Sequence, residues 1–88
     1  MTPVRALAMK RTIVPLPERL RYLARLQKRK AYFAEAGCRF WVFEEAELNG
    51  AFIEFAESDD RETLHAALRD APDLIMDVNR IYQEVPLA

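Results

Sequence analysis

Apolar and polar residues alternate along Val4–Val14 with the period of two that is typical of a half-buried strand. One side of the alternation holds Leu7, Met9 and Ile13, and the other holds Ala6, Ala8, Lys10 and Thr12. Successive side chains of a strand point to opposite faces of its sheet, so the two sets would lie on different faces. The pattern predicts a first β-strand.

The period then changes to that of a helix. Pro15 and Pro17 end the strand, and proline is tolerated in a first helical turn because its missing N–H would have no partner there. Over residues 17–36 the apolar residues fall on one broad face, and these are Leu16, Leu20, Leu23, Leu26, Ala31, Phe33 and Ala34. The cations that fall roughly opposite are Arg21, Arg25, Lys28 and Arg29. Gly37 suits a left-handed stop, so we predict an amphipathic helix with a solvated basic face.

A β-hairpin is the strongest local prediction. Cys38–Leu48 and Ala51–Glu57 are strand-like, and only Asn49-Gly50 separates them. This dipeptide suits the positive φ angles of a two-residue type I′ turn. Such a turn would place Glu45 opposite Glu54, whereas a register shifted by one residue would exchange the two faces of the hairpin.

A second helix is predicted over residues 60–71. Asp59, three residues ahead of Glu62, resembles a capping box, and Pro72 ends the segment. The apolar residues at helical spacing are Leu64, Ala67, Leu68 and Ala71.

The remaining chain completes the predicted fold. Asp73–Asn79 fits either a further helical turn or a loop, and Arg80–Leu87 alternates as a closing strand. The elements therefore follow the order β-α-β-β-α-β within one domain of residues 1–88. We expect an α+β fold with a four-stranded antiparallel sheet and two helices on one of its faces.

This order of elements resembles the ferredoxin-like half-barrels of the dimeric α+β barrel superfamily, which includes NIPSNAP-like and antibiotic-biosynthesis-monooxygenase-like proteins. The resemblance covers nearly the whole chain and rests on element order and length. It implies a homodimer packed sheet against sheet and no particular activity, because members include cofactor-free oxygenases, isomerases and haem-degrading enzymes. The Asn, Trp and His arrangement of the haem-degrading members is not matched by Trp41 and His65, so we expect no haem.

Composition narrows the class of protein. The chain is 51% hydrophobic and 31% charged, and its apolar stretches are far shorter than the roughly 20 residues that span a bilayer. We therefore expect a cytoplasmic globule that does not contact a membrane. Cys38 is the only cysteine and His65 the only histidine, so neither a disulfide nor a cysteine-based or two-histidine metal site can form within one chain. We expect no metal and no cofactor, with Cys38 buried and His65 at the edge of the second helix.

Charge is divided along the chain. Residues 1–43 carry a net charge of +8 and residues 44–88 a net charge of −9, which together leave −1. We expect the halves to attract each other within the fold or across a dimer. The basic helix face, with Tyr32, is the best case for nucleic-acid binding, but the acidic half would repel phosphates, so nucleic acid is not the partner we favour.

The hairpin supplies the candidate site. Two helices can cover only one face of the sheet, so the aromatic face that remains would form a dimer interface or a ligand cleft. We expect Trp41, Phe43 and Phe52 to line this cleft. Glu45 and Glu54 are the weak catalytic candidates, because a carboxylate opposed by another in a dry cleft has a raised pKa.

These features favour a homodimer that binds a small apolar molecule between its sheets, with catalysis an open possibility. The alternatives are a non-enzymatic protein–protein interaction module and, third, a nucleic-acid-binding domain. Both carboxylates could instead point to water or to Lys10 and Arg39.

Overall fold

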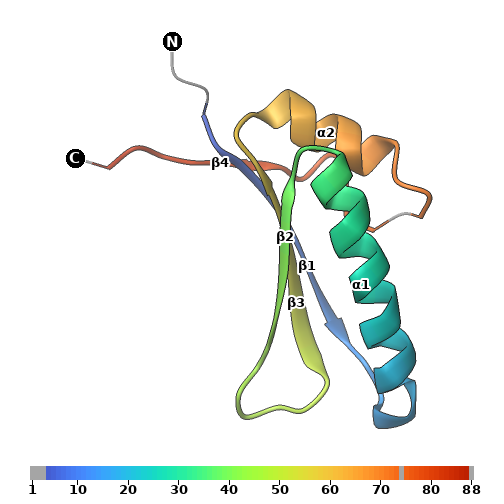
Figure 1. Ribbon diagram of the computed structural model, residues 1–88. Helices are drawn as coiled ribbons and strands as arrows, with labels where there is room; N and C mark the ends of the chain where they lie inside the picture. Colours follow the sequence, from blue (N-terminus) through green and yellow to red (C-terminus); the bar gives the residue numbers. More distant parts are fainter. Residues whose placement is uncertain (1–3, 74, 88) are drawn as a thin grey trace.

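The computed structural model describes residues 4–73 and 75–87 of the chain, and the ends of the predicted 1–88 domain therefore lie outside the described residues. The elements run in the order β1 (Ala6–Ile13), η1 (Leu16–Glu18), α1 (Arg19–Glu35), β2 (Arg39–Glu44), β3 (Ala51–Ser58), α2 (Arg61–Arg69) and β4 (Tyr82–Gln83) (Figure 1). This order matches the prediction from periodicity.

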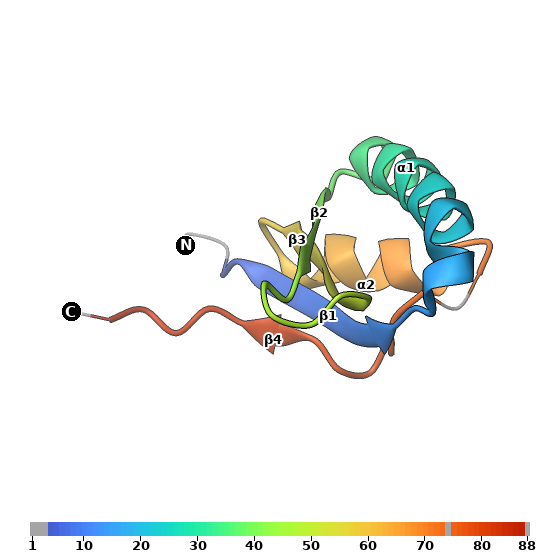
Figure 2. The same cartoon turned by 90° about the horizontal axis from the view of Figure 1, so that it is seen from below.

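The four strands form one antiparallel sheet in the order β2-β3-β1-β4. Both helices lie on the same side of this sheet, as the view in Figure 2 shows. The α+β class, the four antiparallel strands and the two helices are therefore confirmed, and the arrangement is compatible with a ferredoxin-like fold.

The core lies between the sheet and the helices. α1 packs over β2, and α2 packs over β1 and β3. Ala6, Ala8 and Ala56 are almost fully buried beneath the helical layer, and such small side chains let a helix approach a sheet closely. Phe33 of α1 stacks on Phe40 of β2 with ring centroids 5.3 Å apart.

Opposite charges from the two halves of the chain pair within the fold, as the charge division predicted. Ion pairs join Arg5 to Glu57, Arg19 to Glu44, and Arg29 to Glu54. In each pair the cation comes from the basic half and the carboxylate from the acidic half.

The face of α1 that contacts the core agrees only in part with the predicted one, since it keeps Leu26 and Phe33 and excludes Leu16 and Leu20. Tyr22, Leu26 and Phe33 are buried, and Arg29 lies between them on the same side of the helix. Leu16 and Leu20, both placed in the predicted apolar stripe, are 80% and 81% exposed. The buried line has the spacing 4, 3, 4, which is one helical stripe, and leucine count alone pointed to a stripe rotated from it.

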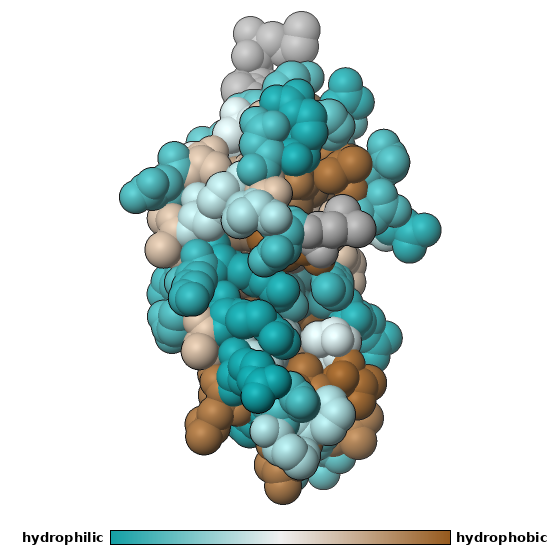
Figure 3. All heavy atoms as spheres, turned by 90° about the vertical axis from the view of Figure 1, so that its right-hand side faces the viewer, coloured by the Kyte–Doolittle hydropathy of each residue, from teal (hydrophilic) through white to brown (hydrophobic). Residues whose placement is uncertain are grey.

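The outer surface of α1 is largely hydrophilic (Figure 3). Hydrophobic residues gather at the lower end of this view. Leu16 of η1 and Leu20 of α1 are among the exposed large hydrophobic residues. Arg21, Arg25 and Lys28 remain exposed, as expected for a solvated basic face. Arg29 does not, because it reaches the buried carboxylate of Glu54.

The predicted register of the hairpin is wrong. Trp41 lies opposite Phe55, and Glu54 lies opposite Val42 rather than Glu45. The shift is three residues, an odd number, so it exchanges the faces of one strand relative to the other. Glu45 and Glu54 are consequently on different sides of the sheet.

The connection between β2 and β3 explains the error. It runs from Glu45 to Gly50, and the Asn49-Gly50 pair is the centre of a turn in which Ala51 N–H donates to the Leu48 carbonyl at 3.2 Å. Gly50 has a φ of 89°, whereas no described non-glycine residue has a positive φ, so the turn is not of type I′. The predicted β2 thus ends at Glu44 instead of Leu48.

The second helix and the closing strand are also shorter than predicted. The N-cap of α2 is Asp60, whose carboxylate accepts from Thr63 N–H at 2.7 Å, and Asp59 instead pairs with Arg39. The described part of residues 73–79 is a loop. β4 is reduced to two residues, and the Glu84 N–H donates to the Arg5 carbonyl just beyond them.

Candidate functional site

The face of the sheet that carries no helix is largely apolar. Pairing places odd-numbered residues of β1, β2 and β3 on this face, and Tyr82 of β4 faces the same way as its partner Leu7. Its apolar side chains are Leu7, Met9, Ile13, Trp41, Phe43, Ile53, Phe55 and Tyr82. We call this set the open face. Ile13 is 70% exposed and Phe43 58% exposed, which is unusual for side chains of this size on a sheet surface.

An aromatic cluster crosses the middle of the open face. The rings of Trp41 and Phe55 are stacked with centroids 5.6 Å apart, and Phe43 meets Phe55 edge-on at 5.8 Å. Both geometries are favourable for aromatic pairs. The three rings therefore form one contiguous cluster within the single chain.

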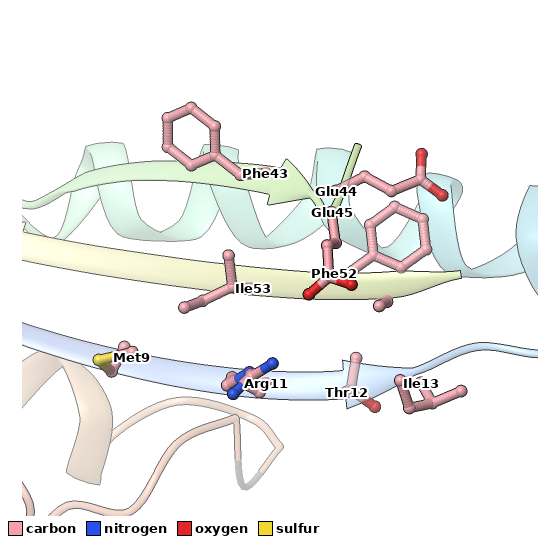
Figure 4. Close-up of a pocket in the computed structure, with 10 residues that line it drawn as sticks. Met9, Arg11, Thr12, Ile13, Phe43, Glu44, Glu45, Phe52 and Ile53 are labelled. Atoms are coloured by element: carbon pink, nitrogen blue, oxygen red, sulfur yellow. The ribbon is translucent and has the colours of Figure 1, made fainter. Parts of the chain in front are cut away.

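A hollow of about 690 Å³ lies on the hairpin side of this cluster. Its lining residues come from three neighbouring strands and the start of the hairpin loop, as Figure 4 shows, and they are Met9, Arg11, Thr12, Ile13, Phe43, Glu44, Glu45, Ala51, Phe52 and Ile53. The size is within the range of small-molecule pockets, about 300–1,000 Å³. Apolar side chains dominate the lining.

Three charged residues line the hollow, and one is already neutralised. Glu44 accepts two hydrogen bonds from Arg19, at 2.7 and 2.9 Å, and a third from Gly50 N–H at 2.8 Å. The hydrogen bonds from Arg19, and then that from Gly50, lower the pKa of Glu44 to about 2. Arg11 and Glu45 form no ion pair with any described residue, so they are the polar groups that the hollow offers.

A second hollow, of about 300 Å³, lies on the other side of the aromatic cluster, between Trp41, Phe55 and Tyr82. Ion pairs border it, because Arg5 contacts Glu57 at 3.3 Å and Glu84 at 2.9 Å. The open face therefore has an apolar centre, a hollow at each end and a charged margin.

The residues predicted for the cleft are divided between the two sides of the sheet. Trp41 and Phe43 lie on the open face, and Glu45 lines its larger hollow. Phe52 and Glu54 point to the helix side, although Phe52 also borders the larger hollow. The ring of Phe52 is 5% exposed and packs on Tyr22 with centroids 4.8 Å apart. Arg19 lies over the Phe52 ring at 5.3 Å.

Glu54 is fully buried and paired rather than opposed by another carboxylate. It accepts hydrogen bonds from the Tyr22 hydroxyl at 2.8 Å and from Arg29 Nη1 at 2.7 Å. Burial, and then the hydrogen bond to Glu54, raise the pKa of Tyr22 above its ordinary value. The predicted Glu45–Glu54 pair is therefore absent from the described structure.

Sequence reasoning missed several residues of the open face, namely Met9, Arg11, Ile53 and Phe55 as parts of one surface. Met9 and Ile13 had been placed on one side of the first strand, and that assignment is correct. Ile53 and Phe55 were not assigned to the open face, because the face on which they lie depends on the hairpin register. A register that pairs Trp41 with Phe55 would have revealed the aromatic cluster.

Cys38 and His65, the only cysteine and the only histidine of the sequence, lie in different surroundings. Cys38 is buried, and burial raises the pKa of its thiol, which disfavours the reactive thiolate. His65 is exposed on α2.

Within residues 4–73 and 75–87, no three His, Cys, Asp or Glu side chains come together as metal ligands. In the same part of the chain, no helix is both long and apolar enough to cross a membrane.

Comparison with known proteins gives no match to a family model, to a curated protein or to a solved structure.

Proposed function

We propose that the protein is a homodimer of the ferredoxin-like, dimeric α+β barrel type, which binds a small apolar molecule between its two sheets. The observation that carries the proposal is the open face, where eight apolar side chains are left without a covering layer. A small domain normally buries both faces of such a sheet, and a second layer from another copy is the simplest way to do so.

The charges of the open face favour a second copy of this chain as the covering partner. Arg11 and Glu45 lack partners among the described residues and lie on the same face. In a two-fold interface the same patch of each copy meets the other. Arg11 of each copy can therefore pair with Glu45 of the other, which gives two ion pairs. A patch with one unpaired charge of each sign is self-complementary in this sense.

The chemistry of the larger hollow indicates the class of ligand. Phe43, Ile53 and Met9 offer apolar contacts, while Arg11 and Glu45 each offer one charged group at the margin. Such a lining fits a small apolar molecule that carries a polar group. The proposal concerns binding, and Glu45 is the residue that would act as a general base if a reaction occurs there.

A fluorescence experiment tests the proposal. Trp41 is the only tryptophan and lies beside the hollow, so it can transfer energy to the neutral apolar probe N-phenyl-1-naphthylamine. We expect saturable probe binding by protein purified without added ligand. Ile53→Phe, which fills the floor of the hollow, should weaken binding while the dimer persists, and Leu20→Phe, on the exposed start of α1, should leave binding unchanged.

A dimer that binds no probe would contradict the ligand part of the proposal and favour the non-enzymatic interaction module. Equal effects of Ile53→Phe and Leu20→Phe would show that the probe does not enter the hollow.

A further inference from the structure

A second, polar pocket lies on the helix side of the sheet, separate from the open face. It has a volume of about 250 Å³ and lies between β1 and the first half of α1. The N-cap Glu18 and the α1 residues Tyr22, Arg25 and Arg29 line it from one side, and their spacing of 4, 3, 4 forms one stripe. The strand contributes Lys10 and Thr12 from its helix-facing side, and Glu54 lies at the same site.

The buried carboxylate in this pocket is already satisfied. Glu54 is held by Arg29 at 2.7 Å and by the Tyr22 hydroxyl at 2.8 Å, and the two charges compensate each other. No buried side-chain polar atom among the described residues lacks a hydrogen-bond partner. Arg29 and Glu54 therefore form a neutral wall of the pocket.

Two cations in the pocket remain uncompensated. Lys10 lies opposite Glu54 in the β1–β3 register, yet neither Lys10 nor Arg25 forms an ion pair with a described carboxylate. Arg25 lies over the ring of Tyr22, with its guanidinium carbon 5.9 Å from the centroid. Glu18, the other carboxylate of the lining, is directed to Arg21 at 3.6 Å.

We propose that this pocket binds a small oxyanion, in the form of a carboxylate or phosphate group, between Lys10 and Arg25. A concave wall with two cations concentrates positive potential more than the same charges do on a convex surface. Lys10 would supply a point charge and Arg25 a planar donor pair, which suits the oxygens of either anion. The Thr12 hydroxyl forms no hydrogen bond with a described residue and offers a neutral donor to the same ligand.

The test is a titration of the full chain with inorganic phosphate and, separately, with acetate, followed by amide chemical shifts at constant ionic strength. We expect saturable shifts at Thr12 and in the first half of α1 with at least one anion. The anion that binds more tightly identifies the group that the pocket prefers. Lys10→Gln and Arg25→Gln should each weaken binding by about tenfold or more, since each removes a charge-assisted contact.

Lys28→Gln is the matched control, because Lys28 is an exposed cation of the same helix that does not line the pocket. The affinity of the Lys28→Gln variant for either anion should equal that of the unaltered chain. The absence of saturable shifts with both anions would overturn the proposal. So would a loss of affinity in Lys28→Gln as large as that in Lys10→Gln, because it would reduce the effect to overall charge.

Discussion

Glu54 is the residue whose surroundings differ most from those that its sequence position suggested. A fully buried carboxylate is tolerated only when it is paired and hydrogen-bonded, and Arg29 and Tyr22 provide both. Removing one partner of a buried pair leaves an uncompensated charge. The stability of the fold should therefore depend on Arg29 more than on any exposed cation of α1.

Arg29→Met should lower the free energy of unfolding by about 3–5 kcal/mol, because Glu54 would then lack its counter-charge. Denaturant unfolding measures this change. Arg21→Met is the control, since the side chain of Arg21 is 74% exposed and such a substitution changes stability by about 0.5 kcal/mol or less. Equal losses in the two variants would show that Glu54 does not depend on Arg29.

Glu44 provides a prediction about acid stability. Its pKa is about 2 in the folded chain, chiefly through the hydrogen bonds from Arg19 and then through Gly50 N–H, against about 4.3 for an unperturbed glutamate. A lowered folded-state pKa stabilises the fold above the unfolded-state pKa, and this stabilisation is lost as the pH falls toward the folded-state pKa. Unfolding free energies between pH 5 and pH 2 should therefore fall less steeply in Glu44→Gln than in the unaltered chain. Parallel curves for the two proteins would contradict the assignment.

At the level of the elements, the sequence predicts which segments are helices and strands, and it predicts the buried stripe of α2, but not the register of the hairpin. The hairpin shows why. Asn49-Gly50 is indeed a turn, yet Glu44 caps Gly50 N–H and the Gly50 carbonyl accepts from Val14 N–H at 2.8 Å. These two contacts, of which the one to Val14 joins segments far apart in the sequence, set the six-residue connection and hence the register. Local turn preference carries no information about them.

α1 shows the same limit. Its length and its glycine stop were predicted correctly, because both depend on local signals. Its buried stripe was predicted only in part, because Leu26 and Phe33 are buried as expected, whereas Arg29 and Tyr22 also face inward and contact Glu54. A buried ion pair between two elements has no periodic signature in either of them.

Gly50 offers a test of the hairpin. Gly50→Ala should destabilise the fold strongly, because the new Cβ would lie 2.5 Å from the Val14 carbonyl oxygen and φ is 89°. Gly37→Ala is the matched control, because its φ is 81° but its nearest contact would be an ordinary 3.5 Å to Thr63 Cγ2. The free energy of unfolding of Gly37→Ala should fall only by the cost of holding an L-residue in the left-handed region, about 1–2 kcal/mol.

Thermal unfolding distinguishes the two variants, since 1 kcal/mol corresponds to about 4–8 °C for a domain of this size. Gly50→Ala should melt well below Gly37→Ala. A melting temperature for Gly50→Ala at or above that of Gly37→Ala would show that the approach of Val14 to the hairpin loop is not as described.

At the level of the whole molecule, the class of fold followed from the order and length of the periodic segments. The existence of an uncovered apolar face also followed, because two helices can cover one face only. Which residues form that face did not follow, since the register error exchanged the two faces of β3. Trp41 and Phe43 were assigned to the open face, whereas Phe52 and Glu54 lie beneath the helices.

The central claim is that the open face joins two copies of this chain. Sedimentation velocity at micromolar concentration should give a dimer for the unaltered chain and a monomer for Phe43→Asp, which places a charge in the aromatic cluster of the face. Leu20→Asp, which adds the same charge at an 81% exposed apolar residue away from the face, should remain a dimer. An unaltered chain that is monomeric at micromolar concentration, or a Phe43→Asp variant that still dimerises, would contradict the account.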